Sequence, residues 1–234
     1  MLDQEFLESI ADCYSPAMGT ENVGPLLYAL VRMTRPQRVL EIGSGYTSLF
    51  LLKALKDNAS AIEQERSAPT SDADFRLASF YKSDFKSVLH SIDNNIHPDS
   101  TASRVAAAAD RLDVSGPLRM HEADFQGYAD KIPAGDQPFD LIWFDCGNLA
   151  YFQSFAQEYF QRVDQNGGLV LIHSLATNMH GQLFMHALKL KQATANFNDF
   201  EIVTLVEPHK MRQNSLTMIR MTSQAHLTLH SVEP

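Results

Sequence analysis

The sequence predicts an α/β fold, a doubly wound sheet in which helices alternate with strands. Three observations support this class. Short apolar runs alternate with segments of helical periodicity, three later runs end in an aspartate, and the first run leads into a glycine-containing turn, "EIGSG". Such alternation is typical of parallel sheets with right-handed crossovers. Ligands of these sheets bind beyond the carboxyl ends of the strands.

The start of the chain is predicted to be a helical cap, residues 1–35. Apolar residues recur at helical spacing over 2–13 and 21–34. A proline then ends the second helix. The next run, "RVLEI" at 38–42, is apolar and bounded by proline and glycine, as expected of a buried strand. We therefore expect the remainder, 36–234, to be one α/β domain.

Within that domain, residues 47–55 are predicted to form a helix, followed at about 58–85 by an insertion. Long insertions in compact domains are commonly lids or binding loops, and this one contains four aromatic residues, Phe75, Phe80, Tyr81 and Phe85. The later elements are expected to be a strand ending at residue 93, a helix over 100–112, strands ending near 124 and at 145, a helix over 149–163, a strand over 167–174, a helix over 183–191 and a final strand pair over 200–208 and 214–222.

The composition disfavours several function classes. A net charge of −9 opposes binding to nucleic acid or an anionic membrane by bulk attraction. Two cysteines, Cys13 and Cys146, are too few and too far apart for a disulfide framework. The first residues are acidic where a secretory signal is basic, and no apolar run is long enough to span a membrane. We expect a cytoplasmic protein with a small-molecule substrate, no nucleic-acid partner and no membrane partner.

Three acids follow predicted strands: Asp93, Asp124 and Asp145. An aspartate in this position can simply cap the next helix. Three of them in succession after a glycine turn favour a shared ligand site, because the carboxyl ends of parallel strands meet at one edge of the sheet.

The glycine turn fits a cationic ligand better than a diphosphate. A dinucleotide fingerprint has a third glycine, and here Ser48 stands at that position. Glu41, just before the turn, would also repel a pyrophosphate. Both points oppose an NAD-dependent oxidoreductase. S-adenosylmethionine carries a sulfonium and an ammonium and no phosphate, so an acid beside the turn favours it.

The stretch "EIGSGYTS" resembles the first motif of class I S-adenosylmethionine-dependent methyltransferases, and the resemblance extends from about Arg38 to Thr222. It implies a Rossmann-like, seven-stranded sheet with an antiparallel last strand, and S-adenosylmethionine as the cofactor. By the same resemblance, the residues expected to contact the methionine end are Glu41, Gly43, Ser44, Gly45, Tyr46 and Asp145. Asp93 would accept the ribose hydroxyls, Asp124 the adenine amino group, and Phe125 would lie near the adenine ring.

One spacing departs from the usual pattern. The ribose acid commonly lies about 20 residues after the glycine turn, whereas Asp93 lies 93 − 45 = 48 residues after Gly45. Glu63 or Glu65 would satisfy the usual spacing. We prefer Asp93 because "SVLHSID" reads as a strand and "ASAIEQE" does not, which makes the excess an insertion.

Within this family, the chain most resembles catechol-type O-methyltransferases in architecture. As the resemblance implies, those enzymes hold a divalent metal with the acid after the fourth strand and an Asp–Asn pair after the fifth. Here Asp145 is followed by His173 and Ser174 in place of that pair. One carboxylate and one imidazole suit a hard cation poorly, so we expect a metal-independent reaction. The catalytic candidates are Asn148, Tyr151 and His173, with His173 as a general base. A packed histidine and a helix-core tyrosine are the alternative interpretations.

The sequence leaves the reaction open. A site without metal or lysine suits methyl transfer to an amine or another neutral nucleophile. The chain is also similar to bacterial azetidine-2-carboxylate synthases in size, insertion and metal-free site. These enzymes cyclise S-adenosylmethionine and release methylthioadenosine, and Asn148 would orient the attacking amine. A non-catalytic binding protein is disfavoured by the intact acids, and a base-modifying methyltransferase by "DCGN" where an "NPPY"-type tetrapeptide is expected. The family suggests a possible homodimer.

Overall fold

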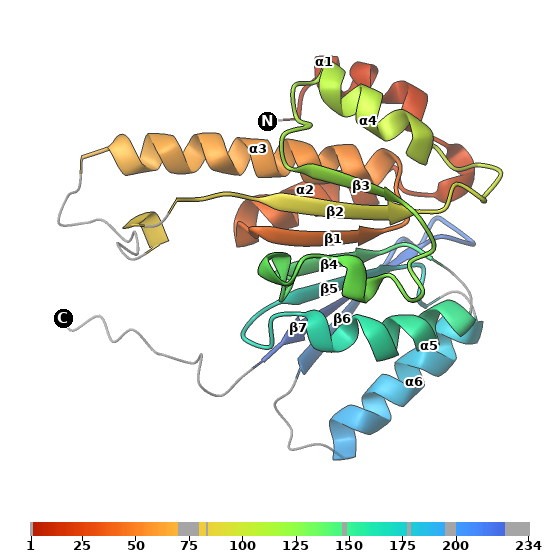
Figure 1. Cartoon of the computed structure of the whole chain (residues 1–234). Coiled ribbons are helices and arrows are strands. Elements are labelled where there is room, and N and C mark those ends of the chain that lie inside the picture. The colour runs from red at the N-terminus through yellow and green to blue at the C-terminus, as the bar shows by residue number, and fades with distance from the viewer. Residues whose placement is uncertain are drawn as a thin grey trace. The chain divides into compact units, whose positions relative to one another are not determined.

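The computed structural model describes residues 2–69, 80–82, 84–146, 149–176, 179–194 and 200–222. The elements are α1 (Gln4–Ser9), α2 (Val23–Thr34), β1 (Arg38–Ile42), α3 (Tyr46–Ser67), β2 (Val88–Asp93), α4 (Ala102–Arg111), β3 (Leu118–Glu122), β4 (Leu141–Phe144), α5 (Leu149–Glu158), β5 (Leu169–His173), α6 (Met179–Thr194), β6 (Phe200–Val206) and β7 (Ser215–Met221). The seven strands form one sheet in the order β3-β2-β1-β4-β5-β7-β6 (Figure 1). The predicted α/β class and seven-stranded sheet are confirmed.

The chain divides into two compact units. Unit 1 contains residues 1–39, 44–91 and 95–121, and unit 2 contains residues 40–43, 92–94 and 122–234. The boundary falls inside β1 and β2, so these units do not correspond to the expected cap at 1–35 and domain at 36–234. That division stays a prediction.

In unit 1, α2 and α3 pack side by side (Figure 1). Their interface is polar in part: Asn58 donates to the Val31 carbonyl at 2.8 Å and accepts from Arg32 at 2.7 Å. Tyr28 donates to Asp57 at 2.7 Å. These bonds satisfy polar side chains that would otherwise weaken a helix, so α3 continues through them to Ser67.

The expected insertion at 58–85 therefore starts too early. Residues 58–67 are the second half of α3, so the predicted end of this helix at residue 55 was wrong. The helix continues there because Asn58 and Ile62 are buried, which the polar sequence around them conceals. Phe80 and Tyr81 lie in a short 3₁₀ turn, Phe80–Lys82. Phe75 lies outside the described residues, and a lid role stays a prediction.

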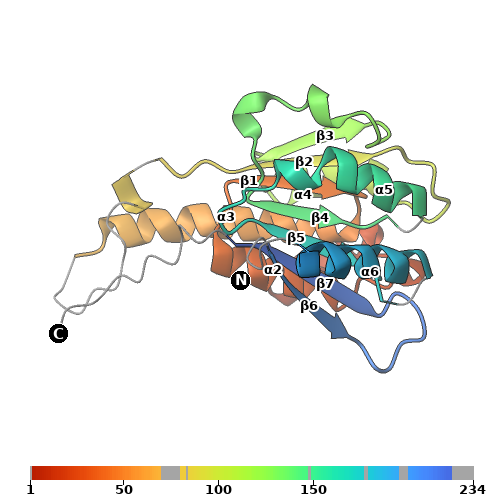
Figure 2. The same cartoon turned by 90° about the horizontal axis from the view of Figure 1, so that it is seen from below.

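In unit 2, α5 and α6 cover one face of the strands (Figure 2). Phe152 of α5 and Phe184 of α6 stack with ring centroids 5.3 Å apart. They join a buried cluster that includes Phe144 and Ile172 from β4 and β5. β4 and β5 pair in parallel, and β7 runs antiparallel to both β5 and β6, so the predicted terminal hairpin is confirmed.

Three backbone hydrogen bonds tie the carboxyl ends of the strands together within unit 2. Gly43 N donates to Ile92 O at 2.9 Å, Asp145 N to Ile42 O at 2.9 Å, and Ala123 N to Asp93 O at 3.0 Å. The ends of β1, β2, β3 and β4 therefore lie at one edge, as the parallel-sheet interpretation requires.

Candidate functional site

The turn after β1 needs glycine at position 43. Gly43 has φ of +95°, a conformation that L side chains rarely adopt, and a Cβ there would lie 2.7 Å from the backbone oxygen of Asp145. The chain after β1 thus approaches the end of β4 more closely than any residue with a side chain allows. The glycine turn predicted from "EIGSG" is present, and its close approach to β4 is a finding of the structure.

In unit 1, the rest of the glycine turn begins α3. Ser44 Oγ and Ser91 Oγ share a hydrogen bond of 2.5 Å. Gly45 N donates to Ser48 Oγ at 2.9 Å, so the serine that stands in place of a third glycine caps the helix. A Cβ on Gly45 would lie 3.0 Å from Thr101 Oγ1. This position therefore also favours a residue without a side chain.

Tyr46 is the first residue of α3 and packs among aromatic rings. Its ring centroid lies 5.2 Å from that of Tyr14 and 4.9 Å from that of Phe50. Burial, followed by the nearby Tyr14 and Glu21, raises the pKa of the Tyr46 phenol. The residue is half-buried, and its expected contact with a methionine chain stays a prediction.

The acids lie where the strand pattern predicts them. Glu41 is fully buried in β1, Asp93 is the last residue of β2, and Asp124 follows β3. Asn94 donates a side-chain hydrogen bond to Asp124 Oδ1. Sequence reasoning missed Asn94, although its place directly after Asp93 puts it at the same strand end.

Glu65, an alternative to Asp93 for the ribose role, forms an ion pair and a hydrogen bond with other residues of unit 1. Both its oxygens accept from Arg35, at 2.6 and 2.7 Å, and Tyr81 donates to it at 2.7 Å. Arg35 in particular lowers the pKa of Glu65 to about 2. Glu63 is paired with Arg66 on the exposed face of α3. Both alternatives to Asp93 for the ribose role are thus engaged in ion pairs. The ribose role of Asp93 itself stays a prediction.

Phe125, expected near the adenine ring, is buried among aromatic side chains. It is 6% exposed, and its ring meets those of Phe144, Tyr151 and Tyr159 at centroid distances of 5.7, 5.5 and 6.0 Å. Phe125 and Tyr151 are thus packed against the core of unit 2. Contact of either with a ligand stays a prediction.

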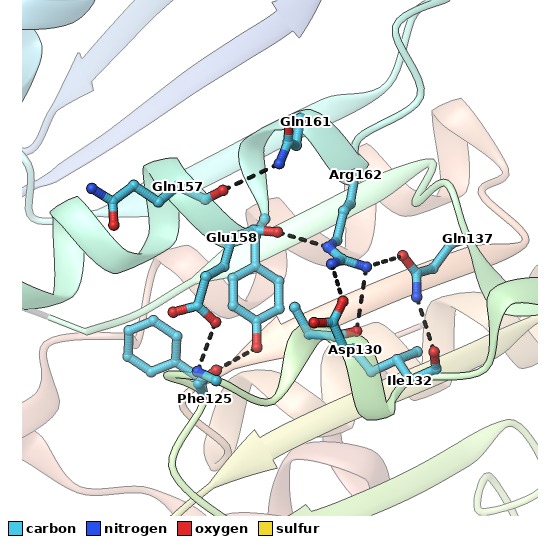
Figure 3. Close-up of polar contacts among 11 residues, drawn as sticks. Phe125, Asp130, Ile132, Gln137, Gln157, Glu158, Gln161 and Arg162 are labelled. Carbon is cyan, nitrogen blue, oxygen red and sulfur yellow. Dashed lines mark hydrogen bonds and ion pairs between the residues drawn. The ribbon is translucent and has the colours of Figure 1, made fainter.

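The segment after Asp124, residues 125–137, is fixed to α5 and the turn that follows it (Figure 3). Tyr159 donates its hydroxyl to the Phe125 carbonyl at 2.5 Å, and Glu158 accepts from Gly127 N at 2.7 Å. Arg162 reaches Gln137 at 2.9 Å and Asp130 at 2.5 Å. These hydrogen bonds fix the position of the segment that follows Asp124.

At the ends of β4 and β5, Asp145 and His173 form a buried pair. His173 Nδ1 lies 2.9 Å from Asp145 Oδ1; the His173 side chain is fully buried and that of Asp145 is 21% exposed. Burial alone would lower the pKa of His173, but the charge of Asp145 and the hydrogen bond to it outweigh burial, so the pKa is raised. Asn148, the third catalytic candidate, lies outside the described residues.

Among the described residues, the donor set at this edge suits a divalent metal poorly, and metal independence stays a prediction. Asp145 is engaged by an imidazole, and the next residue after His173 is Ser174, whose hydroxyl is a weak metal ligand. Within the described ranges, no three His, Cys, Asp or Glu side chains cluster in a way that could hold a metal ion.

Comparison with known proteins decides the family. A family model described as a methyltransferase domain matches residues 40–175. The chain belongs to this methyltransferase domain family. The match begins in β1 and ends just after His173, so it includes the strand ends described above.

Solved methyltransferase structures share the fold. The O-methyltransferase TomG from Streptomyces achromogenes, solved with SAM, aligns with a TM-score of 0.62 and 16% identity over 95% of this chain and 92% of that one. The SAH-bound methyltransferase PaMTH1 from Podospora anserina gives 0.60 and 16% over 95% and 89%. An O-methyltransferase from Bacillus cereus with SAH gives 0.59 and 15% over 95% and 93%.

A search of curated protein sequences returned no match to this methyltransferase-domain chain. None of the helices in the described part of the chain has the length and apolarity needed to cross a membrane.

Proposed function

We propose that this chain is an S-adenosylmethionine-dependent methyltransferase that transfers a methyl group, without a metal, to an amine or another neutral nucleophile on a small molecule. The observation that carries the proposal is the Asp145–His173 pair at the strand edge beside the Gly43 turn. Family membership supports the reaction class, and the solved relatives that contain SAM or SAH support the cofactor.

The residues present fit this cofactor. Gly43 and Gly45 stand where a side chain would crowd the neighbouring chain, and the acids at positions 93 and 124 follow adjacent strands. Buried Glu41 suits a cation better than a diphosphate. When bound, S-adenosylmethionine supplies a methyl group activated by a positively charged sulfur.

The chemistry that the chain itself contributes centres on His173. Next to a carboxylate, neutral histidine holds its proton on the nitrogen that faces the acid, so Nδ1 donates to Asp145 and Nε2 keeps its lone pair. The pair therefore presents an oriented base. Despite burial, Asp145 raises the pKa of His173, which makes the neutral imidazole a stronger base.

A second candidate is cyclisation of S-adenosylmethionine to azetidine-2-carboxylate. The observation that favours it is the same pair, because His173 offsets the charge of Asp145. A carboxylate so engaged stabilises a nearby ammonium less, and cyclisation requires the methionine amine to be unprotonated. The resemblance to the synthases supports this candidate, which requires no external acceptor.

One incubation separates the two reactions. The purified protein is mixed with S-adenosylmethionine alone and the nucleoside product is identified by mass spectrometry. Methylthioadenosine without an acceptor supports cyclisation, whereas inertness until an acceptor is added, followed by S-adenosylhomocysteine, supports methyl transfer. Calorimetry tests the cofactor: tighter binding of NAD than of S-adenosylhomocysteine would contradict both candidates.

A chelator tests the metal. Turnover that is lost in EDTA and restored by magnesium would contradict the metal-independent proposal, and turnover that is unchanged supports it.

A further inference from the structure

The sheet ends on one side at β6. In the strand order β6 stands last, and among the described strands it pairs only with β7 (Figure 2). An edge strand presents a row of backbone N–H and C=O groups to which another strand can bind. The outer side of β6 is therefore a template for further pairing, and the direction of its backbone groups follows from its neighbours.

The two ends of β7 direct their backbone groups toward β5. Ser215 O accepts at 2.6 Å from the N–H of the residue after β5, and Met221 N donates at 2.9 Å to the carbonyl of the residue before β5. Ser215 lies opposite Val206 of β6, and Met221 lies opposite Phe200. Opposed residues of an antiparallel pair either bond to each other or both point away. Val206 and Phe200 therefore direct their backbone groups to the outer side of β6.

The strand period extends this result along β6. The direction of the backbone groups alternates from residue to residue, so Ile202 and Thr204 also face outward. Gln192 Nε2 donates to Phe200 O at 2.8 Å, which agrees with the outward direction and occupies that end of the edge. Within the described part of the chain, no other segment bonds to the outward backbone groups of Ile202, Thr204 or Val206.

The side chains along this edge are apolar and exposed. Val203, Leu205 and Val206 are 50%, 43% and 55% exposed. Natural edge strands commonly carry lysine or proline, which prevents pairing. The strand Phe200–Val206, "FEIVTLV", contains neither and has a single charge. Exposed apolar side chains beside an open backbone edge favour burial against another strand.

We propose that β6 pairs with β6 of a second copy of this chain, antiparallel and centred on Thr204, so that two sheets join into one. The inference is independent of the reaction. A two-fold interface brings the same strand of each copy together. Outward-facing residues must oppose one another for their hydrogen bonds to form. Thr204 thus meets the partner's Thr204, and Ile202 meets the partner's Val206.

The apolar side chains and the open backbone groups both select this register. With Thr204 at the centre, Val203 opposes the partner's Leu205, so the exposed apolar side chains cover one another. A register centred on Val203 would instead oppose Phe200 and the partner's Val206, although the Phe200 carbonyl is already bound by a side chain of α6. The pairing centred on Thr204 leaves that hydrogen bond intact.

The charges at the ends of the pairing balance. In this register Glu201 opposes the partner's Glu207. Each of the two carboxylates has a cation in its own chain, because Arg220 lies 3.2 Å from Glu201 and Lys210 lies 2.9 Å from Glu207. Each end of the pairing therefore brings two carboxylates and two cations together, and no net charge opposes association.

The oligomeric state of the full chain is the first test. Sedimentation over a range of concentrations should show a species of twice 26.2 kDa. The double variant Val203→Lys, Leu205→Lys places lysines opposite lysines and should raise the dissociation constant of the dimer at least about tenfold, because like charges across an interface are unfavourable. Leu190→Lys, on α6 and 54% exposed, is the matched control.

Three results would overturn the inference: a monomeric wild type, a dimer that the two lysines leave unchanged, and an equal loss of dimer in Leu190→Lys. Circular dichroism shows whether the double variant is folded. Should it be unfolded, the decision passes to disulfide trapping, which uses smaller substitutions.

Disulfide trapping also tests the register. Thr204→Cys places two thiols opposite each other, with Cα atoms about 5.5 Å apart, a distance that a disulfide spans. Oxidation should therefore give a covalent dimer. Val203→Cys is the comparison, since the two copies of that position are diagonal neighbours about 7–8 Å apart. The wild type, with its free Cys13 and Cys146, gives the background. Faster cross-linking of Val203→Cys, or none above background in Thr204→Cys, would overturn the proposed pairing.

Discussion

Two stretches of unit 2 are built in opposite ways. In the 125–137 segment, Tyr159, Glu158 and Arg162 satisfy both backbone and side-chain groups (Figure 3). At the end of β5 and in the 207–214 turn, two buried polar atoms, His173 Nε2 and Asn214 Oδ1, have no hydrogen-bond partner among the described residues. The polar groups of the first stretch are satisfied within the chain. The second stretch keeps two polar atoms whose hydrogen-bonding capacity the described residues do not use.

The largest effect is expected from the unsatisfied stretch. His173→Phe removes the proposed base and should lower methyl-transfer turnover by a factor of about 10²–10⁴, the usual contribution of a general base. Steady-state kinetics measures the change, with S-adenosylhomocysteine affinity by calorimetry as the control. Turnover within a factor of about two of the wild type would contradict the role of His173.

The glycine turn is expected to tolerate no side chain at position 43. Gly43→Ala combines a left-handed conformation with a 2.7 Å approach to the Asp145 carbonyl, and should lower the free energy of unfolding by about 2–4 kcal/mol. Urea denaturation measures it. Gly135→Ala is the matched control, since a Cβ there meets nothing within 4 Å. Equal effects at both glycines would contradict the close approach.

The next prediction concerns Asn94, which donates a hydrogen bond to Asp124, the residue directly before the 125–137 segment. Asn94→Ala removes the hydrogen bond to Asp124 and should raise the Kd of S-adenosylhomocysteine about tenfold, because bonds to charged groups contribute about 1.5–3 kcal/mol. Calorimetry measures the affinity, and an unchanged unfolding temperature shows that the fold is intact. An unaltered Kd would remove Asp124 from the cofactor site.

The tether of the 125–137 segment is expected to have a smaller effect. Tyr159→Phe deletes the 2.5 Å bond to the Phe125 carbonyl and leaves that buried carbonyl without the hydroxyl, which should cost about 1–2 kcal/mol of unfolding free energy. Gln161→Ala, on the exposed surface beside it, is the control. Stability losses of the same size in both variants would mean that the tether contributes nothing specific.

The smallest expected effect is on pH dependence. The pKa of His173 is raised by Asp145 against the opposing effects of burial and of Lys210. Its stabilising contribution is therefore complete below the unfolded value of about 6.5 and is lost as the pH rises through the folded pKa. The stability difference between the wild type and His173→Gln should be larger at pH 6 than at pH 9. A difference that grows with pH would reverse the assignment.

The sequence was sufficient for local patterns and insufficient for long-range pairing. Apolar runs located β1, β2, β4, β5 and the terminal hairpin, and the strand-end acids at 93, 124 and 145 followed from them. The length of α3 did not follow, because Asn58 reads as a breaker until its bonds to α2 are known.

The same limit applies to the candidate site. His173 was predicted from its place after a strand, but its pairing with Asp145 depends on how β4 and β5 align. Phe125 was expected beside a ligand, by its place after Asp124, and this stays a prediction; its packing against Tyr151 of α5 could not be read from the sequence.

The turn between β6 and β7 is held by backbone pairing on both sides: Glu207 N donates to Asn214 O at 2.7 Å, and Ser174 N donates to Ser215 O at 2.6 Å. Substitutions in this turn therefore leave the strand ladder in place, whereas adding or deleting a residue would shift the register of β7 against β5. Protein engineering at this edge of the sheet should therefore keep the length of the hairpin constant.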